Sequence, residues 1–145
     1  MEAHSRLTEK AFHGSMEKFL DLTTKLQSKQ VNKMGLSSLE NMREADGREL
    51  LRVMLEEHLQ LRGPADVGDV LEGSDSVVRS HRRERSIGIK TIFGEIAIGR
   101  MVYSKPGHRS LVPKDALIHV IEYLWKASRS FHPEGSLGGE GWVSR

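Results

Sequence analysis

Residues 79–103, RSHRRERSIGIKTIFGEIAIGRMVY, carry the clearest structural pattern in this sequence. Two segments on either side of Gly94 alternate with period two, which is typical of strands with one buried face. The positions on that face are Ile87, Ile89, Thr91 and Phe93, then Ile96, Ile98, Arg100 and Val102. Gly94 can adopt the positive φ that a tight reversal needs. The stretch predicts one β-hairpin at about 86–103, whose first strand begins in a cluster of arginines.

Positive charge is concentrated in the same region. Residues 79–109 contain eight Lys or Arg and two acids, a net charge of +6, whereas the whole chain carries +2. A polyanion such as DNA is therefore expected to meet the hairpin first. The candidate phosphate contacts are Arg79, Arg82, Arg83, Arg85, Lys90 and Arg100.

Two other roles are open for these cations. Charged side chains also protect an exposed edge strand from aggregation. Arg100 points to the hairpin face that we expect to be packed. Its alternative role is a structural ion pair, or a cover over apolar surface by its aliphatic stem.

Length and composition favour a soluble protein with little apolar material to spare. The 145 residues suit one domain or two very small ones. Hydrophobic residues make up 37 % of the chain, below the about 45–50 % of globular domains, although that norm also counts Gly and the gap is therefore narrower. The absence of cysteine excludes disulfides and thiolate metal sites. No apolar run approaches the roughly 20 residues of a membrane span, and the N-terminus lacks the apolar core of a signal peptide. We therefore expect a cytoplasmic protein without membrane contact.

Apolar residues at three- and four-residue steps predict helices at about 15–30, 37–62 and 115–130. The expected boundary signals are a capping box at Ser37 and Glu40, a second start at Asp46, an end at Gly63 and Pro64, and an N-cap at Asp115. Together with the hairpin, these helices predict an α+β fold that is mainly α.

Composition divides the chain into four parts. These are a helical region at 1–62, an acidic linker with Gly and Ser at 63–78, the basic hairpin at 79–114, and an amphipathic helix with a Gly-rich flexible tail at 115–145. Acids recur every three positions in the linker, at Asp66, Asp69, Glu72 and Asp75. A Ca²⁺ loop needs acids at alternate positions and a distal Glu, so we interpret the linker as a solvated segment that repels DNA. We interpret His58 as a hydrogen-bonded packing residue, because no partner for catalysis or metal binding is in view.

Three blocks follow one another between residues 46 and 117: DGRELLRVMLEEHLQLRG, HRRERSIGIKTIFGEIAIGRMVY and LVPKDAL. In this order they resemble the N-terminal region of ISKra-type insertion-sequence transposases. That family shares a DGRELLR block, an arginine run before T-x-F-G-x-V-x-V-x-R-x-x-Y, and P-L-D-x-x-L. The matching positions are Asp46, Gly47, Arg48, Glu49, Leu50, Leu51, Arg52, Thr91, Phe93, Gly94, Ile96, Ile98, Arg100, Tyr103, Pro113, Asp115 and Leu117. The resemblance implies a mobile-element protein whose partner is DNA.

A second match is out of place. HVIEYLWKASRSFHPEGS, residues 119–136, resembles a segment of the same family's catalytic domain that directly follows its second catalytic aspartate. In the family, a long stretch with the first aspartate and much of an RNase H-like sheet separates this segment from the third block. Here the two are joined, and the position three before His119 is Ala116. We interpret the chain as a fusion left by an internal deletion near 116–119, truncated at the C-terminus as well.

The family would use Mg²⁺, and the residues here predict that it is not bound. Transposition of the DDE type needs two divalent ions about 3.5–4 Å apart, held by a set of three carboxylates. The acids of this chain lie in predicted helices and a loop, without the sheet that would gather them. His119 and Glu122 share a helical face, but two ligands are too few for a site. We expect no cofactor and no catalysis.

Three hypotheses for function follow. The first is a non-catalytic DNA-binding remnant of a transposase. The second is a protein-interaction fragment, because the predicted helices offer wide apolar faces for a homo-oligomer or for binding to intact transposase. The third is a product without a selected function.

Overall fold

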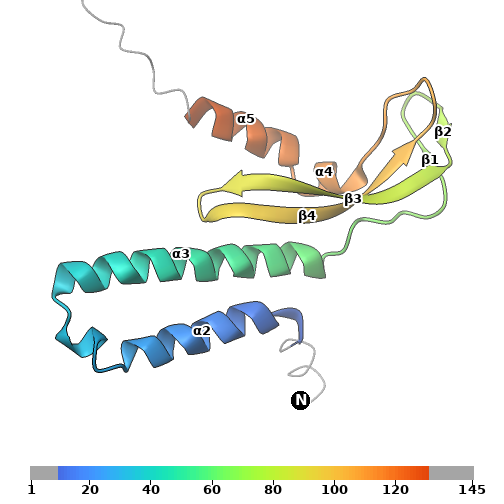
Figure 1. The fold of residues 1–145 in the computed structure, drawn as a ribbon. Helices are drawn as coiled ribbons and strands as arrows, with labels where there is room; N and C mark the ends of the chain where they lie inside the picture. Colours follow the sequence, from blue (N-terminus) through green and yellow to red (C-terminus); the bar gives the residue numbers. More distant parts are fainter. Residues whose placement is uncertain (1–9, 131–145) are drawn as a thin grey trace, which may run out of the picture.

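The computed structural model of the chain describes residues 10–130, with side chains for 10–126 (Figure 1). Within that range the fold is α+β, as predicted, but it contains two antiparallel hairpins rather than one. No helix in the described range is both long enough and apolar enough to cross a bilayer. The expected Gly-rich tail, from residue 131 onward, lies outside the described residues.

Helices α2 (His13–Leu26) and α3 (Leu36–Leu61) form an antiparallel pair joined through a 3-10 turn, η1 (Val31–Lys33) (Figure 1). The side chain of Glu57 on α3 accepts hydrogen bonds from Ser15 Oγ at 2.6 Å and from the Gly14 amide at 2.7 Å. Near the other end, Lys25 Nζ donates to Asp46 at 2.8 Å. The predicted helix at 37–62 is confirmed within one residue at each end, while α2 ends four residues before the predicted limit.

The expected start signals of the second helix are wrong. Gly35 is the N-cap of α3 and no side chain bonds there, so Ser37 and Glu40 form no capping box. The helix then continues through Asp46 without interruption. The Asp46 carboxylate binds Lys25 of α2 instead of the backbone N–H groups that a cap would satisfy.

Strands β3 (His81–Thr91) and β4 (Gly94–Ser104) form the predicted hairpin, with Ile87 opposite Ile98 and Ile89 opposite Ile96. Gly94 has φ 127°, which confirms its predicted role in the reversal. The hairpin is longer than predicted, because β3 begins at His81 and includes the arginine run. The arginine run is part of the strand because β4 continues to Ser104 and its last residues pair with the run.

The predicted linker contains a second hairpin, which corrects the expectation of a single one. Its strands are β1 (Leu71–Glu72) and β2 (Val78–Arg79). The turn between them is closed by Asp75, whose carboxylate accepts from the Val77 amide at 3.1 Å and binds Arg79. Two-residue strands are too short to show a period in the sequence.

The predicted helix at 115–130 is two helices, α4 (Pro113–Leu117) and α5 (Val120–Ser130). They are separated at His119, which has φ 51°. The N-cap of α4 is Val112, so the expected cap at Asp115 is wrong. Asp115 pairs with Arg100 of β4 instead, which fixes α4 on the hairpin.

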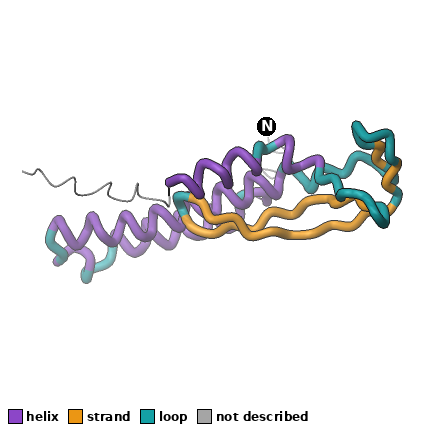
Figure 2. Tube along the Cα trace, turned by 90° about the horizontal axis from the view of Figure 1, so that it is seen from above, coloured by secondary structure: helices purple, strands orange, loops and turns teal. Residues whose placement is uncertain are grey.

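The core is small and lies where three elements meet. It consists of Leu59 of α3, Ile89, Ile96 and Ile98 of the hairpin, and Val120 of α5. Figure 1 shows the hairpin running between α3 and α5, and Figure 2 shows the α2–α3 pair projecting beyond the hairpin tip. His58 is exposed and its imidazole has no hydrogen bond within the described residues, so the hydrogen bond expected for it is not found there; its side chain lines a hollow together with Leu55 and Leu59.

Candidate nucleic-acid interface

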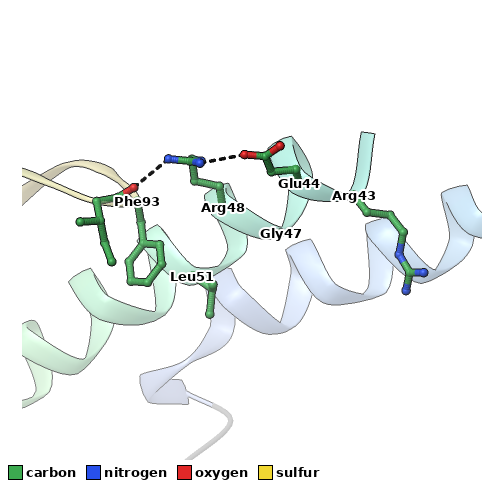
Figure 3. Close-up of a pocket in the computed structure, with 7 residues that line it drawn as sticks. Arg43, Glu44, Gly47, Arg48, Leu51 and Phe93 are labelled. Carbon is green, nitrogen blue, oxygen red and sulfur yellow. Dashed lines mark hydrogen bonds and ion pairs between the residues drawn. The ribbon is translucent and has the colours of Figure 1, made fainter. Parts of the chain in front are cut away.

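The first two of the resemblance blocks contact each other at the hairpin tip. Arg48 Nη1 donates to the Ile92 carbonyl at 2.9 Å and its Nη2 to Glu44 at 2.9 Å (Figure 3). Arg52 Nη1 donates to the Glu95 carbonyl at 3.2 Å. A Cβ at Gly94 would lie 3.0 Å from Arg52 Cδ, so a side chain there would require Arg52 to shift and would also be strained at this φ. A shallow hollow of about 440 Å³ lies beside this contact.

The third block joins the other end of the hairpin to α3. Asp115 forms an ion pair with Arg100, and both side chains are about four-fifths buried, at 18 % and 20 % exposure. Lys114 is 3 % exposed and its ammonium donates to three main-chain carbonyls. Arg100 therefore takes the structural ion pair rather than an open position on the surface.

Arg79 also has a structural position. Its side chain is 1 % exposed, with Nη2 2.7 Å from Asp75 Oδ2 and Nε donating to the Arg109 carbonyl at 2.7 Å. A guanidinium enclosed in this way does not reach a phosphate on the surface. The pKa of Asp75 lies well below its ordinary value because Arg79 donates to the carboxylate.

Arg82 is engaged by the acidic segment at 63–78. Its guanidinium lies 2.6 Å from Asp66 and 3.1 Å from Asp69. The pKa of Asp66 is lowered by the Gly68 amide first, then by Arg82 and the Tyr103 hydroxyl. The segment is thus not a free solvated linker, since its carboxylates occupy arginines of the basic region.

Within residues 79–109, five cations remain exposed and make no side-chain ion pair or hydrogen bond to the described residues. They are Arg83, Arg85 and Lys90 of β3, and Lys105 and Arg109 in the turn after β4. We call this set the basic edge. The turn lies beside the start of β3, because His81 pairs with Ser104. In this register Lys105 lies about 10 Å along the strands from Arg83 and about 17 Å from Arg85, at 3.3 Å per strand residue. Lys90 lies about 17 Å from Arg85 in the other direction, on the opposite face of the hairpin.

Of the six predicted contacts, the structure leaves Arg83, Arg85 and Lys90 free and gives Arg79, Arg82 and Arg100 protein partners. Lys105 and Arg109 lie in the positively charged region of the sequence but are not among the six predicted contacts. The sequence signal for these two residues is the positively charged region itself, which extends past the predicted strands to residue 109.

Glu49 gives the helical pair a defined pH dependence. Its pKa is lowered from 4.5 to about 2, chiefly by the hydrogen bond from Arg52. A carboxylate with a lowered folded-state pKa stabilises the protein above pH 4.5, and this contribution is lost as the pH falls toward 2. Because Glu49 is 43 % exposed, solvent screening limits the contribution to about 1 kcal/mol or less.

We expect Glu49→Gln to lower the free energy of unfolding near neutral pH and to flatten its decline between pH 4.5 and 2. Urea denaturation followed by circular dichroism at several pH values measures this. Glu40→Gln, at an exposed site on the same helix, is the matched control. An acid profile of Glu49→Gln that superimposes on that of the unmodified protein would contradict the prediction.

The described residues contain no group of three or more His, Asp or Glu side chains that could hold a metal ion. His119 and Glu122 form an exposed pair with Nδ1 3.6 Å from Oε1. No protein-family model, curated protein or solved structure matches the chain.

Proposed function

We propose that this chain is a non-catalytic DNA-binding remnant of an ISKra-type insertion-sequence transposase. The observation that carries the proposal is the basic edge, where five cations without partners among the described residues lie in a region of net charge +6. Such cations bind phosphates and give affinity without sequence choice. The family named in the proposal rests on the resemblance of the three sequence blocks alone.

A fluorescence-anisotropy titration on duplex DNA at several salt concentrations tests this. If all five cations contact phosphates, the slope of log K against log salt is expected to be about −4.5. Affinity then falls about 500-fold between 50 and 200 mM salt. Absent binding, or binding indifferent to salt, would count against the proposal.

The proposed lack of catalysis has its own test. The carboxylates of the described residues are spread over helices, strands and loops, and Asp66, Asp75 and Asp115 are engaged by arginines. We expect purified protein to leave duplex DNA intact with Mg²⁺ present. Strand cleavage that a chelator abolishes would overturn this part of the proposal.

A protein-interaction role is the second candidate, favoured by apolar exposure. On α2 and α3, Met16, Phe19, Leu20, Leu51 and Met54 are 42–60 % exposed. On α5, Ile121, Leu124 and Trp125 are 46–67 % exposed. Faces of this kind suit self-association or binding to intact transposase. Sedimentation velocity that shows a monomer at every concentration would argue against self-association.

A further inference from the structure

The outer edge of β4 is closed along most of its length. Three side chains bind its outward main-chain groups: Arg52 donates to the Glu95 carbonyl, Lys114 donates to the Gly99 carbonyl, and Glu56 accepts from the Ala97 amide. Farther along the strand, the Met101 amide donates to the Pro64 carbonyl, and Tyr103 pairs with Leu111 through main-chain bonds. Helix α3, the loop after it and residue 111 thus satisfy the groups that would otherwise recruit another strand.

The outer edge of β3 is open. The residues of β4 whose main-chain groups point away from β3 are odd-numbered, from Glu95 to Tyr103. Their partners in the register therefore point their main-chain groups away from β4, and these are Arg82, Glu84, Ser86, Gly88 and Lys90. The Lys90 carbonyl accepts from the Tyr123 hydroxyl at 3.3 Å. Among the backbone groups of residues 10–130 and the side chains of residues 10–126, no hydrogen-bond partner reaches the outward main-chain groups of the other four, and all four residues are exposed.

An open row of alternating N–H and C=O groups is complementary to another β-strand. A second copy of β3 fits poorly, because antiparallel pairing centred on the open segment places Arg85 opposite Arg85 of the other copy. Like charges directly opposite each other destabilise a strand pair. The side chains that flank the edge, Arg83 and Arg85 above all, favour a strand with acidic residues instead.

We propose that the open edge of β3 binds an extended acidic segment of a partner protein by main-chain pairing, adding a third strand to the β3–β4 hairpin. The proposal rests on the unpaired backbone groups and is independent of DNA binding. Because both ligands use Arg83 and Arg85, the acidic strand and DNA compete for the protein.

The probe is a short synthetic peptide of alternating Glu and Val residues, titrated onto the full chain by calorimetry. We expect binding, together with slowed amide exchange at Ser86 and Gly88. Ser86→Pro removes one outward N–H and leaves the β3–β4 ladder intact, since proline is tolerated on an edge whose N–H faces solvent. Its expected effect is at least a tenfold loss of peptide affinity, with DNA affinity unchanged; Ser86→Thr keeps the donor and is the control.

Two further probes decide the mechanism without altering the protein. The same peptide N-methylated at alternate residues cannot pair through its main chain, and a version with Lys in place of Glu lacks the charge. Both are expected to bind at least tenfold more weakly. Equal binding by either peptide, or a dimer that forms without peptide and is lost in Ser86→Pro, would overturn the proposal. Absence of peptide binding would also overturn it while leaving the DNA result intact.

Discussion

Replacing Lys114 with Met is expected to lower the free energy of unfolding by about 2–4 kcal/mol, the largest effect of any single substitution considered. Lys114 Nζ donates to the Leu59 carbonyl at 3.0 Å, the Gly63 carbonyl at 2.5 Å and the Gly99 carbonyl at 2.9 Å. One ammonium thus binds the end of α3, the loop that follows it and β4 together. Methionine fills similar space and leaves all three carbonyls without a donor.

The ammonium itself is costly to bury, which reduces the net loss. The pKa of Lys114 is lowered by burial first and by the nearby positive charge of Arg62 second. The three carbonyls and the negative end of the α3 dipole offset that cost. Hydrogen bonds to charged groups contribute about 1.5–3 kcal/mol each, so three of them outweigh a partial desolvation penalty.

Chemical denaturation followed by circular dichroism measures the effect. Lys33→Met, at an exposed site, is the matched control and is expected to change stability by less than about 0.5 kcal/mol. Lys114→Arg separates charge from geometry, because a planar guanidinium cannot direct donors to the same three carbonyls. A Lys114→Met variant as stable as the Lys33→Met control would show that the three bonds contribute nothing.

Periodicity in the sequence predicted α3 and the β3–β4 hairpin because both have long apolar faces that meet in the core. Ile89 and Ile96 were placed on one face by alternation, and the structure pairs them directly. The break at His119 left no local signal, since apolar residues recur at helical spacing on both sides of it. It arises because Lys114 and Asp115 fix α4 on distant parts of the chain.

The candidate site was predictable as a region but not residue by residue. Arg79 and Arg83 look alike in the sequence, yet one is enclosed by Asp75 and the Arg109 carbonyl and the other is exposed. The difference depends on how the acidic segment folds over the start of β3. The acidic segment is held there partly by the Tyr103 hydroxyl, which donates to Asp66 at 3.0 Å. The two residues are 37 positions apart in the sequence, so local patterns do not reveal this contact.

The double variant Arg83→Gln/Arg85→Gln is expected to weaken duplex DNA binding by roughly tenfold to a hundredfold at low salt. Two phosphate contacts fewer also lower the magnitude of the salt slope by about 1.8. Both side chains are exposed and make no bond within the described residues, so the fold is expected to be unaffected.

The control for that experiment must remove the same charge from another place. Lys29→Gln/Arg43→Gln does so on the α2–α3 pair, where both side chains are exposed and lie outside the basic edge. General attraction between a cationic protein and DNA falls equally in the two double variants. A smaller slope of log K against log salt concentration is expected only for the Arg83 and Arg85 variant. Equal losses in both would mean that the basic edge is not the DNA contact. Phosphate binding would then depend on net charge, and Arg83 and Arg85 would serve only to keep the open edge of β3 from pairing with its own copies.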